Sequence, residues 1–229
     1  MTEQAAPRAD PCACPGHFHD LMTKIRKCKE RQTCLSLTSR RYYFEPNPCT
    51  AQEWRTEERA YLSGIDARVV FVCESPGKFG AEDQAAPLRC FAKANTWQDK
   101  RFREALEKHG YENCYMTNAM KCGVRKGNRH TERELSACRP FLVRELDLLK
   151  PLVAVGVGEN AYRTLRQDVL PRLRCPPVDA AGHVRPQGGR TVSFQITHFY
   201  ARRDVDAKWE REFAELKRLL ERLKPRSEW

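Results

Sequence analysis

The side chains best suited to chemistry in this sequence stand where short apolar segments end. They are Glu74 and Ser75 after one segment, Asn118 at the end of a second, and His198 after a third. A carboxylate can orient water or balance positive charge, and an imidazole can donate to a developing anion. A side-chain amide offers a donor and an acceptor side by side, which suits the edge of a pyrimidine. Together these groups indicate a site that binds a nucleobase and assists its departure.

Each of these residues also has a purely structural interpretation. The Glu-Ser-Pro-Gly sequence at 74–77 is compatible with an ordinary turn between a strand and a helix, in which Pro76 and Gly77 make the bend. In that case Asn118 caps a strand and His198 is a structural histidine at the entry to a helix. The functional interpretation therefore depends on whether the three segments meet.

The apolar segments predict the strands of a parallel sheet. Short apolar runs bounded by turn residues are typical of strands buried on both faces, and four occur here: 69–73, 114–119, 152–157 and 192–197. Segments in which apolar residues recur at helical spacing alternate with these strands. Three of them are 97–108, 158–170 and 204–223, and a fourth begins at a capping box formed by Thr131 and Glu134. This alternation predicts an α/β fold, a three-layer α/β/α arrangement with a central four-stranded parallel sheet. Parallel strands put their carboxyl ends at one edge, which would bring the polar groups together.

Composition indicates a single domain that binds a polyanion. The 229 residues suffice for one core, and we expect 1–16 to be a flexible tail and 17–229 one domain with a cysteine-bearing N-terminal extension. Forty-one Lys and Arg against 30 Asp and Glu favour nucleic acid or an anionic membrane surface as partner. No apolar run approaches the ~20 residues that span a bilayer. Since 1–10 also lacks an apolar export signal, we expect a cytoplasmic protein, monomeric and not bound to a membrane.

Cysteine usage indicates a metal or cluster site. Eleven cysteines in a chain without an export signal are expected to be reduced thiols. Four of them are candidate ligands: Cys28, Cys34, Cys122 and Cys138. Four thiolates suit a [4Fe–4S] cluster, and zinc is the chemical alternative. Cys73, Cys90 and Cys114 lie in or beside apolar segments and are expected to pack in the core.

Several segments resemble the iron–sulfur (family 4) uracil-DNA glycosylases. Residues 73–77, Cys-Glu-Ser-Pro-Gly, resemble that family's Gly-Glu-Ala-Pro-Gly motif. Residues 115–122, Tyr-Met-Thr-Asn-Ala-Met-Lys-Cys, look like its Tyr-Ile-Thr-Asn-Val-Val-Lys-Cys segment, and 137–142 is similar to its second cluster-ligand helix. The likeness covers roughly 25–220. This chain departs from the pattern at Cys73 and Ser75, and it lacks the proline that follows the family's histidine.

The resemblance implies roles for further residues. Glu82 resembles part of the family's Glu-Asp pair, where a carboxylate orients water, and Phe91 would stack on the base. Phe199 and Tyr200 stand in the loop that wedges into the duplex. The basic loop that begins at Lys121 and the segment after Tyr200 would hold the DNA backbone through Arg125, Lys126, Arg129, Arg202 and Arg203. The cluster on Cys28, Cys34, Cys122 and Cys138 would be structural.

The sequence therefore predicts a monofunctional DNA glycosylase. It would flip out a uracil or a modified pyrimidine and hydrolyse the N-glycosidic bond, leaving an abasic site. The expected catalytic residues are Glu74, Glu82 and His198, and the expected base contacts are Ser75, Phe91 and Asn118. Two alternatives stay open: a glycosylase specialised on a hypermodified viral base, and a non-catalytic DNA-binding module that kept the fold and the cluster.

Overall fold

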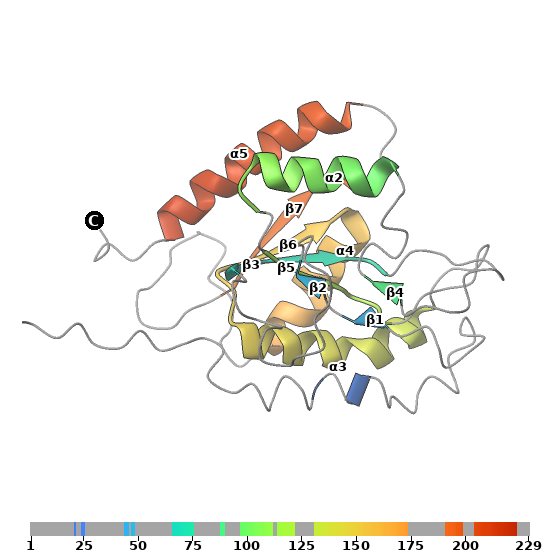
Figure 1. The fold of residues 1–229 in the computed structure, drawn as a ribbon. Helices are drawn as coiled ribbons and strands as arrows, with labels where there is room; N and C mark the ends of the chain where they lie inside the picture. The colour runs from blue at the N-terminus through green and yellow to red at the C-terminus, as the bar shows by residue number, and fades with distance from the viewer. Residues whose placement is uncertain are drawn as a thin grey trace, which may run out of the picture.

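The computed structural model describes the elements that form the core of the chain. The described residues are 66–75, 97–111, 114–121, 131–173, 191–198 and 204–223, with short stretches at 21, 24–25, 44–45, 47–48 and 88–89. Within this part, helices lie on both sides of a sheet (Figure 1). No helix among the described residues is long and apolar enough to cross a membrane.

The central sheet contains four parallel strands. Their order across the sheet is β5 (Cys114–Asn118), β3 (Asp66–Cys73), β6 (Val153–Val157) and β7 (Val192–Ile196). This confirms the predicted four-stranded parallel sheet, although β3 begins three residues before the apolar run (Asp66 rather than Val69). A two-residue strand that sequence reasoning did not predict, β2 (Asn47–Pro48), adds an antiparallel edge beside β5. A separate small parallel pair is formed by β1 (Phe44–Glu45) and β4 (Leu88–Arg89).

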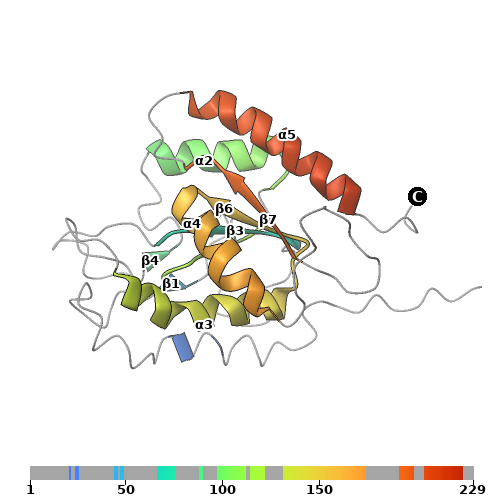
Figure 2. The ribbon, with the colours of Figure 1, turned by 180° about the vertical axis from the view of Figure 1, so that it is seen from behind.

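Different helices cover the two faces of the sheet, which makes the fold three-layered. One face packs against α2 (Trp97–Lys108) and α5 (Val205–Leu223), and the other against α3 (Glu132–Leu149) and α4 (Glu159–Arg163) (Figures 1 and 2). Side chains of each strand alternate between the faces. Phe71 therefore packs in the core under α2 and α5, whereas Val72 packs in the core under α3. Cys73 and Cys114 are buried in the first of these cores, as predicted.

Three of the four predicted helices form close to their expected bounds. The capping box that opens α3 is present: the Glu134 carboxylate accepts from Thr131 N at 2.7 Å, and Glu134 N donates to Thr131 Oγ1 at 3.3 Å. The helix predicted over 158–170 is not a single α-helix. It comprises α4, a π-helical turn η4 (Thr164–Val169) and a 3-10 turn η5 (Leu170–Arg172). Pro171 lacks the N–H that would continue the α-helical pattern.

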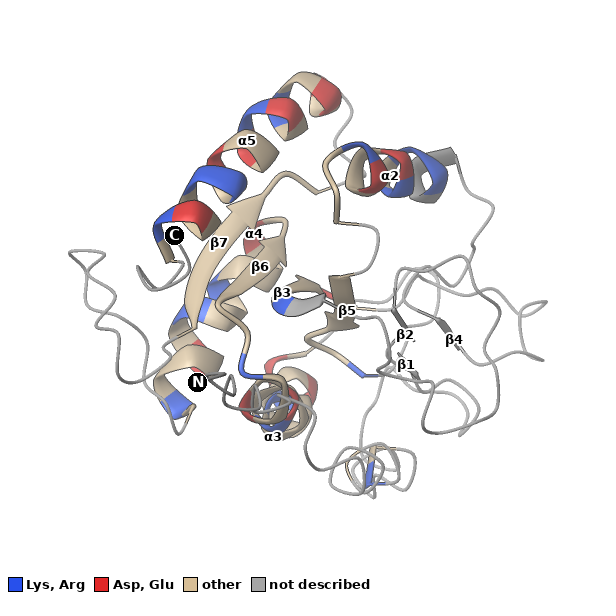
Figure 3. Ribbon diagram, turned by 60° about the vertical axis from the view of Figure 1, so that its left-hand side comes forward, with Lys and Arg blue, Asp and Glu red and all other residues tan. Residues whose placement is uncertain are grey.

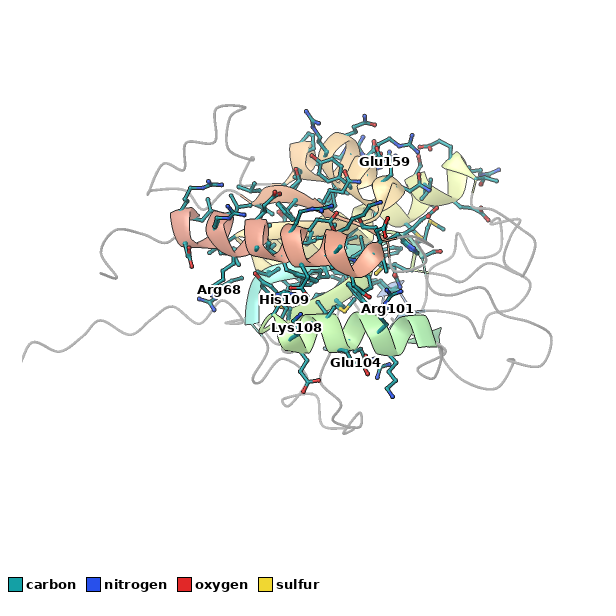
Figure 4. The ribbon with its side chains drawn as sticks, turned by 90° about the horizontal axis from the view of Figure 1, so that it is seen from above. Arg68, Arg101, Glu104, Lys108, His109 and Glu159 are labelled. Carbon is teal, nitrogen blue, oxygen red and sulfur yellow. The ribbon has the colours of Figure 1, made fainter. Side chains whose placement is uncertain are left out.

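Ion pairs lie at the edge of the α2–α5 contact. Arg101 Nε donates to Asp206 Oδ1 at 2.7 Å, and Lys108 pairs with Glu210. Figure 4 shows Arg101, Lys108 and His109 in the space between the two helices. Positive and negative side chains are interleaved along both helices (Figure 3). Because these pairs are largely exposed, the apolar core beneath them contributes most of the stability.

Several sequence predictions fall outside the described residues. In the N-terminal part of the chain, Leu21 and Ile25 are helical and buried. The tail expected at 1–16, and with it the predicted division into a tail and a single domain, lies outside the described residues.

Candidate active site at the carboxyl edge of the sheet

The ends of β3 and β5 lie directly side by side. Cys73 and Asn118 are partners in the parallel ladder. Pairing continues past both strands, since Ala119 N donates to Cys73 O at 2.8 Å and Met120 N donates to Glu74 O at 2.9 Å. Glu74 is therefore fixed beside the chain that follows Asn118. Two of the predicted site residues are brought together by main-chain hydrogen bonds.

Asn118 is a fully buried amide with no hydrogen-bond partner among the described residues. Its side chain is 0% exposed, and neither Oδ1 nor Nδ2 has a hydrogen-bond partner in the described part of the chain. Met116 packs in the core under α2 and α5, so alternation along the strand puts Asn118 on the same face. A strand-capping asparagine would bond to neighbouring main chain, and this one does not among the described residues. A buried unsatisfied amide costs about 1–3 kcal/mol, which a ligand with a complementary edge would offset.

His198 follows β7 by two residues and is packed against the end of β6. A Cβ on Gly158 would lie 3.0 Å from both Cβ and Cδ2 of His198, so a larger residue at this position would press against the ring. Burial lowers the pKa of the His198 imidazole from its usual value near 6.5, and the negative charge of Glu74 partly opposes this effect. The neutral ring therefore predominates at neutral pH, and it keeps one N–H donor.

Glu74 links the strand ends on either side of it. Its Oε2 accepts from Asn160 Nδ2 of α4 at 3.2 Å, and its charge acts on His198. Ser75 continues the bend after β3 and is half-buried. Because β3 and β6 separate β5 from β7, the ends that carry Asn118 and His198 stand on one edge about 14 Å apart, at the usual strand spacing of ~4.8 Å.

Helix α5 holds the main chain immediately before His198. Glu212 accepts from Thr197 N at 2.7 Å and from Thr197 Oγ1 at 2.6 Å. Trp209 Nε1 donates to Thr197 O at 2.9 Å. Sequence reasoning placed Trp209 on the apolar face of this helix and gave Glu212 no role, because nothing in its neighbourhood distinguishes it from the other charged residues of α5.

Lys121 is not part of an exposed basic loop, which corrects the expectation from sequence. It is buried, and it pairs with the equally buried Glu145 of α3. Burial raises the pKa of the Glu145 carboxyl, and Lys121, Thr117 and Tyr115 oppose that effect. The Thr117–Lys121 spacing in the sequence carries no signal that a second charge 24 residues further on would meet this ammonium.

The structure does not describe the remaining predicted site residues, with one exception. Those outside the described residues are Glu82, Phe91, Arg125, Lys126, Arg129, Phe199, Tyr200, Arg202 and Arg203, and the candidate ligands Cys28, Cys34 and Cys122. The exception is Cys138, which is buried on α3. Within the described ranges, no group of three or more His, Cys, Asp or Glu side chains is arranged to hold a metal ion.

Comparison with known families identifies the class to which the chain belongs. Residues 60–225 match the family described as the uracil DNA glycosylase superfamily, and because the match covers most of the chain, the chain belongs to that superfamily.

Individual relatives agree with the resemblance seen in the motifs. The chain is 26% identical over 121 residues to a type-4 uracil-DNA glycosylase of Thermotoga maritima, covering 52% of this chain and 60% of the relative. It is 32% identical over 106 residues to the enzyme of the same name from Archaeoglobus fulgidus, covering 44% and 50% of the two chains. A third, from Sulfurisphaera tokodaii, is 27% identical over 115 residues, half of each chain. These matches span about half the length of the curated relatives.

Proposed function

We propose that this protein is a DNA glycosylase that removes uracil or a related modified pyrimidine from DNA. The observation that carries the proposal is the buried amide of Asn118, which has no hydrogen-bond partner among the described residues. It lies beside the end of β3 that carries Glu74 and on the same edge as His198, whose pKa is lowered by burial. The names of the relatives support uracil as the first base to test.

Asn118 is the proposed base reader. Uracil presents an N–H donor beside a carbonyl acceptor, and the amide of asparagine offers the complementary acceptor and donor. The amide is out of reach of a base within the duplex stack, so the nucleotide has to be extruded. Ser75 and Phe91 complete the proposed base contacts, with Phe91 stacked on the ring. The residues proposed to hold the DNA are Arg125, Lys126, Arg129, Phe199, Tyr200, Arg202 and Arg203.

Cleavage in this proposal breaks the bond between C1′ of the sugar and N1 of the base. The electron pair leaves with the base as an anion, while the sugar develops oxocarbenium character. His198 donates its N–H to the departing anion, which stabilises negative charge where it forms. Glu74 or Glu82 orients the water whose oxygen bonds to C1′, and the proton of that water passes to the carboxylate or to solvent. The enzyme forms no covalent bond to the sugar, and the product is an abasic site.

A [4Fe–4S] cluster on Cys28, Cys34, Cys122 and Cys138 completes the proposal, with zinc as the alternative metal. Cys138 fits this role to the extent that its thiol is buried on the helix directly after the Cys122 segment. The cluster would have a structural role, tying the N-terminal segment to α3. Brown protein with absorbance near 400 nm and bound iron would support the cluster, whereas colourless protein with bound zinc would favour the alternative.

Single-turnover assays test the function directly. Duplex and single-stranded oligonucleotides carrying uracil, a deaminated purine or a hypermodified pyrimidine are incubated with excess protein, and abasic product is measured. We expect uracil release that falls at least ~100-fold in Asn118→Ala and His198→Ala. Release only from the hypermodified substrate would identify a specialised glycosylase. Tight DNA binding without any abasic product would identify a binding module and overturn the proposal.

A further inference from the structure

A buried ion pair lies behind the strand that carries Asn118. Lys121 Nζ pairs with Glu145 Oε2, and the two side chains are 1% and 0% exposed. The same ammonium donates to Thr117 Oγ1 at 2.7 Å and to the main-chain oxygen of Asn118 at 2.7 Å. An ammonium has three N–H donors, and these three acceptors match them in number.

The carboxylate of Glu145 is held equally firmly. Its Oε1 accepts from Tyr115 Oη at 3.3 Å, and the Thr117 hydroxyl lies 3.1–3.2 Å from its two oxygens. Tyr115 and Thr117 are both in β5 and both fully buried, and Glu145 is on α3. The network therefore joins the middle of α3 to the last residues of β5 without contact with solvent.

Packing alone does not account for such a pair. Removing two charges from water costs about as much as their attraction returns, and apolar side chains of similar volume are often at least as stabilising. Apolar side chains, however, cannot donate a hydrogen bond to a carbonyl oxygen. The feature specific to this pair is that it fixes the Asn118 carbonyl at the point where β5 ends.

We propose that Lys121, anchored by Glu145, is a positioning residue that fixes the Asn118 peptide so that the amide side chain meets the extruded base. The inference rests on the proposed function of Asn118 as base reader. Lys121 lies on the α3 face of the sheet, while Asn118 points to the face of α2 and α5. The ammonium therefore acts through the main chain and does not contact the base.

The lack of described hydrogen bonds to the Asn118 side chain explains why its main chain has to be held in place. Neither Oδ1 nor Nδ2 is held by another described residue, so the direction of the amide depends on the backbone that carries it. The N–H groups of the residues that follow, Ala119 and Met120, donate to the carbonyls of Cys73 and Glu74, whereas the Asn118 carbonyl accepts from Lys121. A shift of about 1 Å in a positioned group can lower a rate ~100-fold.

A double-mutant cycle tests this inference. Single-turnover uracil release is measured for the full-length wild type, Lys121→Met, Asn118→Ala and the combined variant. We expect Lys121→Met to reduce the rate at saturating protein by at least ~10-fold in the wild-type background. In the Asn118→Ala background the same change should alter the rate by less than ~3-fold, because the residue through which it acts is gone. Affinity for DNA that carries a product-like abasic analogue should change little.

A matched control separates positioning from loss of stability. Leu146→Ala removes a buried apolar side chain of the same helix that takes no part in the hydrogen bonds of the Lys121 network. It should lower the melting temperature while leaving the rate of the folded protein unchanged. If Lys121→Met does not fold, the isosteric Glu145→Gln replaces it, with a smaller loss of about 3–10-fold that again requires Asn118.

Three outcomes would overturn the inference. They are an unchanged rate in Lys121→Met, an equal loss in Leu146→Ala, and an effect of Lys121→Met that persists without Asn118. If the wild type releases uracil and Asn118→Ala releases it at a much lower but measurable rate, any of these overturns the inference alone. If the wild type releases no uracil, the proposed function fails first and the inference with it.

Discussion

Gly158 and His198 pack so closely that a side chain on the glycine would be in tight contact with the imidazole. The contact joins the ends of β6 and β7, where a Cβ on Gly158 would lie 3.0 Å from two atoms of the His198 side chain. Gly158 also has φ +89°, a backbone conformation that other residues rarely adopt. The absence of a side chain on Gly158 thus helps to set the position of the imidazole.

Gly158→Ala is therefore expected to impair both stability and excision. The backbone strain costs about 1–3 kcal/mol, and displacement of the ring should lower the single-turnover rate by ~10-fold or more. The matched control is Gly110→Ala, which has the same kind of positive φ but open space around its Cβ. It should destabilise by about 1–2 kcal/mol and leave the rate unchanged. An equal rate loss in both variants would show that strain, and not contact with His198, is responsible.

The charge state of His198 gives a prediction in pH. Burial lowers its pKa below the usual value near 6.5, while Glu74 raises it. An NMR titration should therefore find the His198 pKa below that value, and Glu74→Gln should lower it further. The His198 imidazole binds a proton more readily in the unfolded chain than in the folded protein. The stability that the neutral ring contributes is therefore complete above the pKa of His198 in the unfolded chain, and it is lost as the pH falls towards the pKa in the folded protein. A His198 pKa above 6.5 would contradict this electrostatic description.

The Glu212–Thr197 contact predicts a second positioning effect at the same histidine. Glu212→Ala removes the acceptor for both the N–H and the hydroxyl of Thr197, which should cost about 1–3 kcal/mol and lower the excision rate. Glu210→Ala, on the same helix, removes a largely exposed carboxylate that pairs with Lys108 and lies 3.5 Å from His109 Nε2, and it should change neither the stability nor the rate noticeably. Chemical denaturation and single-turnover assays measure the two effects. An unchanged rate in Glu212→Ala would show that His198 keeps its place without this contact.

The sequence predicts the sheet well because a buried parallel strand has a local signature. The run Val69–Cys73 and the capping box at Thr131 each depend on neighbouring residues, and both form as expected. The groups that support the site depend on residues far apart in the chain. Lys121 meets Glu145 across 24 positions, and a charged residue looks the same in sequence whether it is solvated or paired in the core. Long-range pairing of polar groups is therefore what sequence reasoning missed.

The break in the helix after β6 is a milder case of the same limitation. The apolar spacing over 158–170 is compatible with one α-helix, but the chain forms a π-helical turn at Thr164–Val169. Tyr162 is pressed against β6, where a Cβ on Gly156 would lie 2.4 Å from its Cα. This close contact of α4 with β6 is visible only once the sheet is assembled, but Tyr162 precedes the π-helical turn, and no contact among the described residues explains the change of helical pattern at Thr164.

The unpartnered amide of Asn118 leads to a prediction in which stability and activity move in opposite directions. Asn118→Val replaces a buried, unsatisfied amide with an apolar β-branched side chain that suits a strand. We expect the free energy of unfolding to rise by about 1 kcal/mol, because the variant no longer buries two polar atoms without partners. Uracil release should fall at least ~100-fold, because the base loses its hydrogen-bonding partner. Chemical denaturation and single-turnover assays on the same preparation measure both.

The matched control is Thr117→Val, one residue earlier, where the hydroxyl does have partners and its loss should lower stability. A destabilised Asn118→Val would mean that the amide serves the fold, whereas a more stable and inactive variant is the behaviour of a residue whose partner is the substrate.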